Sequence, residues 1–258
     1  MYIEKYVQEP RHIEFQIMAD KFGNVIHLGE RDCSIQRNHQ KMIEESPSAA
    51  VSSELREKMG HAAVTAAKAA GYVNAGTIEF LLEPDGKFWF MEMNTRIQVE
   101  HPVTEWVTGI DLVKEQLKIA SGMPLEIAQE DVRIQGHAIE CRINAENPQK
   151  NFRPSPGTIQ GAHFPGGNGI RVDTCVYNGC KIPPYYDSML AKLIVHAGNR
   201  KEAIAKMQSA LGEVIIDGID TNIDYQYEIL KDEDYQSGNF DTGFLASHII
   251  AGVKINEN

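Results

Sequence analysis

The stretch GTIEFLLEPDGKFWFMEMN, from Gly76 to Asn94, decides the fold of the first half of this 258-residue chain. Two apolar runs flank the segment Glu83–Lys87, whose Pro-Asp-Gly core is typical of a tight turn. The stretch therefore predicts a β-hairpin with strands over residues 76–82 and 88–94. Side chains alternate along a strand. We expect one face of the outgoing strand to carry Thr77, Glu79 and Leu81, and one face of the returning strand to carry Phe88, Phe90, Glu92 and Asn94.

This hairpin predicts an acidic site at one end of its sheet. The turn places Glu79 roughly across from Met91 or Glu92, so two carboxylates and the Asn94 carboxamide gather there. Facing carboxylates repel each other unless a cation lies between them. Oxygen ligands of this kind suit Mg²⁺ or Mn²⁺ that holds nucleotide phosphates. Two solvated glutamates on a strand face would have the same spacing, so both interpretations stay open.

The residues directly after the hairpin suggest an anion site beside a base. Arg96 precedes Glu100 by four residues in the run TRIQVEHP, from Thr95 to Pro102. A guanidinium can hold a small planar oxyanion through two parallel hydrogen bonds. A neighbouring carboxylate could then remove a proton from that anion. A surface Arg–Glu ion pair fits the same spacing.

The rest of the chain predicts an α+β protein with mainly antiparallel sheet. We expect a domain boundary near residue 130. The first part predicts strands over 12–17 and 25–28, a polar irregular loop over 31–46, a helix from Ser52 or Ser53 to about Ala70, and a helix over 107–121. The second part predicts a strand over 133–145 and helices near 201–211 and 223–230. Arg142 would share a face of that strand with Glu140 and Asn144, either as a fixed functional charge or in a salt bridge with Glu140 or a neighbour.

Composition and charge exclude several classes of partner. The formal net charge is −11 and no basic stripe balances it, so nucleic acid is not an expected partner. No apolar run reaches the roughly 18–20 residues of a membrane helix, and residues 1–6 lack the apolar stretch expected of a signal peptide. The four cysteines, Cys33, Cys141, Cys175 and Cys180, lack zinc-like spacing. We expect a cytoplasmic protein with reduced, buried thiols and no membrane partner.

Several motifs together resemble the biotin carboxylase family. The run EMNTRIQVEHPVTE, from Glu92 to Glu105, matches that family's signature. Further matches are PRHIE (10–14), ERDCSIQRNHQK (30–41), GHAIECRINAE (136–146), PPYYDSM (183–189) and DGIDTN (217–222). The resemblance covers essentially the whole chain. It implies the C-terminal part of an ATP-grasp fold over residues 1–130, followed by a β-rich biotin carboxylase C-terminal domain over 131–258.

The resemblance also implies a role for each motif residue. ATP with Mg²⁺ or Mn²⁺ would be the cofactor, and biotin on biotin carboxyl carrier protein the substrate. Metal ions would be held by Glu79, Glu92 and Asn94, and bicarbonate by Lys41, Arg96, Gln98 and the Val99 backbone. Glu100 would deprotonate bicarbonate, which then attacks the γ-phosphate to give carboxyphosphate, and Arg142 would stabilise the biotin enolate. Nucleotide contacts would come from Glu4, Lys5, His12, Gln36 and His39, together with Glu79 and Glu92.

The implied activity is the first half-reaction of acetyl-CoA carboxylase, with carboxyltransferase subunits as partners and a homodimer as the assembly. Members of the family carry an N-terminal domain and a Gly-rich lid ahead of the position of Glu4, and this chain has no Gly-rich phosphate loop. We therefore expect the isolated chain to be inactive, because water would reach the carboxyphosphate. A non-catalytic module that binds biotin or a partner, or mediates dimerisation, is the alternative. Carbamoyl-phosphate synthetase, another ATP-grasp ligase, is disfavoured by the β-rich second part with Arg142.

Overall fold

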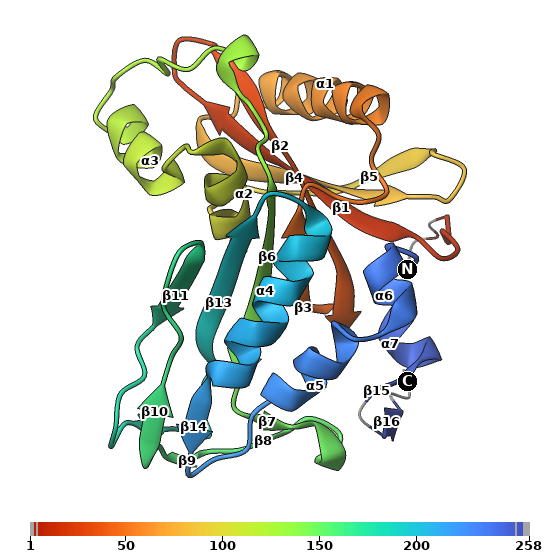
Figure 1. The fold of residues 1–258 in the computed structure, drawn as a ribbon. Coiled ribbons are helices and arrows are strands. Elements are labelled where there is room, and N and C mark those ends of the chain that lie inside the picture. Colours follow the sequence, from red (N-terminus) through yellow and green to blue (C-terminus); the bar gives the residue numbers. More distant parts are fainter. Residues whose placement is uncertain (1–2, 4, 251, 255–258) are drawn as a thin grey trace. The chain divides into compact units, whose positions relative to one another are not determined.

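Apolar and polar residues alternate along Arg11–Ala19, and this alternation gives the first sheet two different faces. The computed structural model describes residues 3, 5–250 and 252–254, so the predicted nucleotide contact Glu4 lies outside the described residues. The chain divides into two compact units. Unit 1 comprises Met1–Ser34 and Glu45–Gln135, and unit 2 comprises Ile35–Glu44 and Gly136–Asn258 (Figure 1).

Unit 1 is an antiparallel sheet with helices on both faces. Its strands are adjacent in the order β2-β1-β4-β5. Helix α1 covers one face of this sheet (Figure 1). The elements up to residue 135 are β1 (Arg11–Ala19), β2 (Val25–Arg37), β3 (Gln40–Ser46), α1 (Ser53–Ala69), β4 (Asn74–Leu82), β5 (Phe88–Asn94), α2 (His101–Thr108), α3 (Leu112–Ala120) and the 3-10 turn Gln129–Asp131.

The apolar face of this sheet packs against α1. Ile13, Phe15 and Ile17 of β1 form a core with Ile78 and Phe80 of β4 and with the small or flexible helix residues Met59, Ala63 and Ala67. Ser52 caps the helix by accepting a hydrogen bond from the Leu55 N–H, so the predicted helix start is confirmed. Helix α3 packs on the opposite face against Met18, Leu28 and Ala75. The remaining polar positions of that second face form the site described below.

Two predictions about the first part of the chain were wrong. Residues 31–46 are not a loop but most of a β-hairpin, with β2 and β3 joined at Asn38 and His39. These two residues have φ of 48° and 61°, the left-handed pair of a two-residue hairpin turn. The polar residues looked like a loop, but most are buried and hydrogen-bonded across the sheet. The predicted helix over 107–121 is two helices, because Gly109 ends α2 with φ of 71° and Asp111 caps α3.

The predicted hairpin over 76–94 is confirmed, but one face assignment was wrong. The register shifts between Glu79 and Phe80, so that Glu79 pairs with Glu92 whereas Phe80 pairs with Phe90. Met91 is therefore an extra residue, a β-bulge that reverses which face the following side chains occupy. Phe88 and Phe90 lie on the Phe80 side of the hairpin, not on the side of Glu92 and Asn94.

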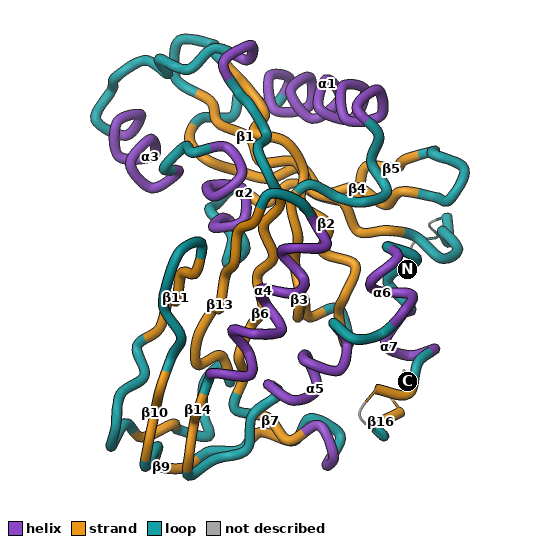
Figure 2. The backbone as a smooth tube through the Cα atoms, viewed as in Figure 1, coloured by secondary structure: helices purple, strands orange, loops and turns teal. Residues whose placement is uncertain are grey.

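Unit 2 is a β-rich unit in which helices cover an antiparallel sheet. Its strands run in the order β11-β13-β6-β3, and α4 contacts both β6 and β13 (Figure 2). The predicted helices near 201–211 and 223–230 are confirmed as α4 and α5. The predicted strand 133–145 is shorter, because Gly136 turns with φ of 70° before β6. The elements are β6 (His137–Asn144), β7 (Glu146–Asn147), the 3-10 turn Pro148–Lys150, β8 (Arg153–Pro154), β9 (Gly157–Thr158), β10 (Gly161–His163), β11 (Ile170–Thr174), β12 (Lys181–Ile182), β13 (Met189–Ala197), α4 (Arg200–Glu213), β14 (Ile215–Asp217), α5 (Ile223–Ile229), α6 (Glu233–Ser237), α7 (Phe244–Ser247), β15 (Ile249–Ile250) and β16 (Val253–Lys254).

Two expectations from composition bear on the described residues. Among these residues, no helix has both the length and the apolar character needed to cross a membrane. All four cysteines are free thiols. Cys33 and Cys141 are buried as expected, and burial raises the pKa of the Cys141 thiol well above its ordinary value. Cys175 is exposed, so the expectation of buried thiols was wrong for that residue.

Candidate functional site

A row of four charged side chains crosses the sheet of unit 1 on the face opposite α1. Glu14 on β1 pairs with Arg31 on β2 and with Glu79 on β4. Glu79 in turn pairs with Glu92 on β5, which decides between the two partners that the sequence had left open. The next row towards α2 contains Gln16, Thr77 and Asn94. Because directly paired residues of an antiparallel sheet point to the same face, these side chains lie side by side.

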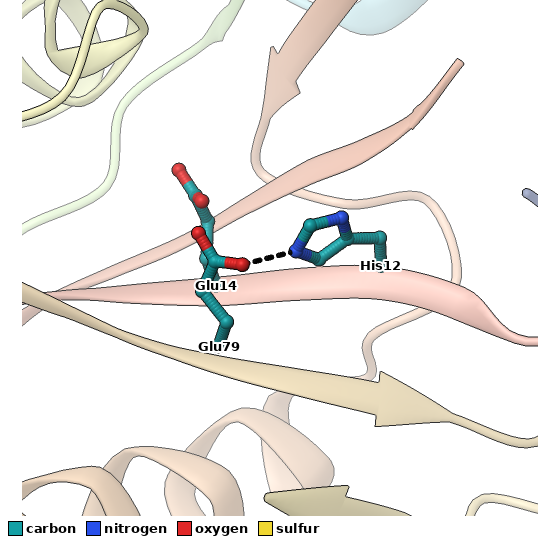
Figure 3. Close-up of side chains that lie close together, drawn as sticks. All are labelled: His12, Glu14 and Glu79. Carbon is teal, nitrogen blue, oxygen red and sulfur yellow. Dashed lines mark hydrogen bonds and ion pairs between the residues drawn. The ribbon is translucent and has the colours of Figure 1, made fainter. Parts of the chain in front are cut away.

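Glu79 is the centre of this row. Its Oε2 lies 2.7 Å from His12 Nε2, and Figure 3 shows both side chains projecting from neighbouring strands beside Glu14. Its Oε1 accepts hydrogen bonds from Gln98 Nε2 at 2.7 Å and from Asn94 Nδ2 at 2.9 Å. Asn94 Nδ2 also lies 3.2 Å from Glu92 Oε1. The two carboxylates and the carboxamide predicted from the hairpin therefore meet at one point.

This donor set fits a hard divalent cation. Asn94 Nδ2 lies within hydrogen-bond distance of both Glu79 and Glu92, so the two carboxylates are within reach of one ion and the amide supports them. Mg²⁺ and Mn²⁺ prefer carboxylate oxygens of this kind. Glu79 is 2% exposed, whereas Glu92 is exposed. The candidate site is therefore buried on the side of Glu79 and open to solvent on the side of Glu92.

Arg31 is the fully buried cation of this row. Its Nε donates to Glu14 Oε1 at 2.5 Å, and its other nitrogens donate to the side chains of Gln16, Thr77, Gln98 and Thr104. Burial alone would lower the pKa of Arg31, but the carboxylates of Glu14 and Glu100 more than offset it and raise that pKa. Arg31 thus balances buried negative charge and links three strands to the segment that follows the hairpin.

That segment, residues 95–101, carries the predicted anion site and base. Arg96 is exposed, and its Nη2 lies 3.3 Å from Asn94 Oδ1, so the guanidinium sits beside the candidate metal site. Glu100 is 2% exposed at the start of α2. One oxygen of Glu100 lies within 4.8 Å of an oxygen of Glu14. A general base must come within hydrogen-bond reach of the proton that it takes, and this short segment supplies a buried carboxylate and an exposed guanidinium as candidates.

The remaining predicted residues lie away from this cluster or in unit 2. Lys5 is exposed, forms an ion pair with Glu83 at 2.8 Å and lies 3.8 Å from the centre of the Trp89 ring. Unit 2 contains Gln36, His39 and Lys41 on the β2–β3 hairpin and Arg142 on β6. The Arg142 guanidinium bonds to Glu44 of β3, with Nε 2.6 Å from Glu44 Oε1. Its partner is thus a residue 98 positions away in the sequence.

Two central residues of unit 1, Glu14 and Arg31, have no role predicted from the sequence, although both lie in quoted motifs. The sequence feature that could have pointed to Glu14 is the alternation of apolar and polar residues along β1, in which Glu14 and Gln16 interrupt a run of buried apolar residues. A charged residue at such a position needs a buried partner. The identity of that partner depends on strand pairing, which the alternation does not specify.

Two family models match the chain. A model for the carbamoyl-phosphate synthase L chain ATP-binding domain matches residues 1–128, and one for the biotin carboxylase C-terminal domain matches residues 140–247. Among curated proteins, biotin carboxylase 1 of Bacillus subtilis is 59% identical over 253 residues, which is 98% of this chain and 56% of that protein. The biotin carboxylase of a Nostoc species is 58% identical over 245 residues, which is 95% of this chain and 55% of that protein.

Solved structures agree with these matches. The biotin carboxylase domain dimer of Hydrogenobacter thermophilus 2-oxoglutarate carboxylase, in complex with MgADP, ADP and bicarbonate, has a TM-score of 0.93 and 53% identity. The match covers 95% of this chain and 54% of that one. The biotin carboxylase subunit of pyruvate carboxylase has the same TM-score and identity over the same shares. The chain spans about half the length of the curated relatives it matches.

Proposed function

Because this chain belongs to the biotin carboxylase family, we propose that it takes part in the ATP- and bicarbonate-dependent carboxylation of biotin. The observation that carries the proposal is the convergence of Glu79, Glu92 and Asn94 beside the segment from Arg96 to Glu100. A candidate cation site next to a guanidinium and a buried carboxylate suits an anion that must be deprotonated and phosphorylated.

Within this proposal, each group of unit 1 has a distinct task. Glu79, Glu92 and Asn94 would hold Mg²⁺ or Mn²⁺, which would supply charge neutralisation for the ATP phosphates. Arg96, Gln98 and the Val99 backbone hold bicarbonate. Glu100 takes the proton of bicarbonate, whose oxygen then attacks the γ-phosphorus while the bond to the ADP oxygen breaks. The products of this step are ADP and carboxyphosphate.

The second step transfers carbon dioxide to biotin. Carboxyphosphate loses its phosphate through cleavage of the carbon–oxygen bond, and the released phosphate takes the proton from N1′ of biotin. N1′ then attacks CO₂, and the carboxylated ureido ring results. Arg142 stabilises the negative oxygen of the biotin enolate, since a guanidinium held on a strand does not have to reorganise when charge develops. In unit 1, His12 and Lys5 contact the nucleotide.

We further propose the domain assignment, the cellular location, the assembly and the partners that the resemblance implies. Residues 1–130 form the C-terminal part of an ATP-grasp domain and residues 131–258 a biotin carboxylase C-terminal domain. The parent enzyme works in the cytoplasm as a homodimer, accepts biotin on biotin carboxyl carrier protein, and supplies carboxybiotin to carboxyltransferase subunits of acetyl-CoA carboxylase. The dimeric biotin carboxylase domain of Hydrogenobacter thermophilus supports the homodimer.

A chimera tests the function directly. This chain replaces the matching region of Bacillus subtilis biotin carboxylase 1, and phosphate release is measured with ATP, bicarbonate and free biotin. We expect turnover that requires all three substrates, and a fall of at least about 100-fold on Glu100→Gln. Lys58→Met, which alters an exposed ion pair on α1, is the matched control and should leave turnover unchanged. A folded chimera that binds nucleotide without turnover would contradict the proposal.

The same assay on the chain by itself tests the expected inactivity. We expect no phosphate release above background, because the chain has no Gly-rich loop to cover the phosphates. Robust turnover by the chain alone would overturn this expectation without affecting the assignment of the reaction.

A further inference from the structure

Helix α5 holds the main chain of β6 at Arg142. Asn222, at the start of this helix, is fully buried, and its Nδ2 donates to the Arg142 carbonyl at 3.0 Å while its Oδ1 accepts from the Asn144 N–H at 2.8 Å. Its own N–H donates to the Asn144 carbonyl at 3.2 Å. Asn222 therefore bonds to the backbone of β6 as a neighbouring strand would.

A second amide from the same helix reaches the same atom. Gln226 lies one turn after Asn222 and is also fully buried, and its Nε2 donates to the Arg142 carbonyl. A carbonyl oxygen has two lone pairs, and here two side-chain amides bond to it. The helix thus fixes the backbone at the one residue of β6 to which the proposed function assigns a catalytic charge.

Glu44 holds the guanidinium group of Arg142. Its Oε1 accepts from Arg142 Nε at 2.6 Å and from Nη2 at 2.5 Å. The Glu44 side chain is fully buried, whereas the Arg142 side chain is 17% exposed. Both the main-chain carbonyl and the guanidinium of Arg142 therefore form hydrogen bonds with buried partners, while part of the side chain is exposed to solvent.

We propose that Asn222 and Gln226 are positioning residues for Arg142, and that Glu44 orients its guanidinium. This inference rests on the proposed role of Arg142 towards biotin. A guanidinium stabilises a developing enolate best when its place is set before the charge appears, and a displacement of about 1 Å can cost about 100-fold in rate. The segment DGIDTN, from Asp217 to Asn222, then has a function: it ends with the residue that locks β6.

The first experiment compares Gln226→Met with Gln208→Met in the chimera described above. Gln208 is a matched control, because its Nε2 also donates to a backbone carbonyl of unit 2, that of Leu230 and not that of Arg142. We expect Gln226→Met to lower kcat/KM for biotin about 10- to 100-fold with KM for ATP unchanged, and Gln208→Met to leave both unchanged. Equal losses for biotin and ATP, or equal behaviour of the two variants, would show a purely structural role and overturn the proposal.

Glu44→Gln keeps the inference testable if Gln226→Met does not fold. This variant keeps the shape of the side chain and removes its charge, so we expect the same selective loss for biotin. An unchanged kcat/KM for biotin would overturn the orienting role.

NMR of the isolated chain adds a readout that needs no turnover: hydrogen exchange of the Arg142 Nε–H should be slow and should accelerate in Glu44→Gln and Gln226→Met but not in Gln208→Met. An inactive parent chimera would refute the proposed function, whereas unchanged exchange in these variants would refute the positioning.

Discussion

Replacing Arg31 by methionine tests whether the buried row of unit 1 depends on this cation. Arg31 and Glu14 are both fully buried, so Arg31→Met leaves a carboxylate without its main counter-charge and removes hydrogen bonds to four further side chains. Breaking a buried ion pair from one side costs about 3–5 kcal/mol. A typical domain has only about 5–15 kcal/mol of unfolding free energy, so this loss is a large fraction of the total.

Urea unfolding followed by tryptophan fluorescence measures this loss. The two tryptophans, Trp89 and Trp106, both lie in unit 1 and therefore report on the right part of the chain. Adding Glu14→Gln to Arg31→Met removes the bare charge, so the double variant should be more stable than the sum of the single effects predicts, by about 2 kcal/mol. Lys58→Met, at an exposed ion pair with Glu54, should change nothing measurable. A cost below about 1 kcal/mol for Arg31→Met, or additive single effects, would refute the reasoning.

Three further outcomes follow from the structure. Burial, with the nearby Arg56, lowers the pKa of His27 from 6.5 to about 4. Between these two pH values the unfolded chain binds more protons than the folded chain. The unfolding free energy should therefore fall by about 3 kcal/mol as the pH drops from 7 to 4. His27→Gln should flatten that pH dependence in urea titrations, and an unchanged slope would contradict it. Glu92→Gln should weaken Mn²⁺ binding at least about 10-fold in electron paramagnetic resonance titrations, with Glu57→Gln on α1 as the control that leaves it intact. Gly109→Ala should destabilise the fold by about 1 kcal/mol because the φ of Gly109 is 71°. Gly212→Ala, in the ordinary helical backbone of α4, should stabilise the fold by a similar amount. Thermal unfolding measures both variants, and shifts of the same sign would contradict the prediction.

Local chemistry in the sequence was enough to predict several parts of the fold and site. The Pro-Asp-Gly turn and its flanking apolar runs predicted the hairpin that brings Glu79 and Glu92 together. Ser52 predicted the start of α1 because a cap acts within one turn of its own position. The motif from Glu92 to Glu105 predicted the biotin carboxylase family, because it carries several candidate site residues in one continuous run, and the matches with known biotin carboxylases agree with it.

Tertiary structure alone decided the features that depend on distant partners. The polar residues from Arg31 to Ser46 form strands because their buried side chains find partners such as Glu14 and Gln98, which adjacent residues cannot reveal. Which face Phe88 and Phe90 occupy depended on one extra residue, Met91, whose bulge follows from pairing with β4. The contacts that hold Arg142 come from positions 80 to 98 residues away, and strand and helix packing brings them together through hydrogen bonds that no sequence spacing encodes.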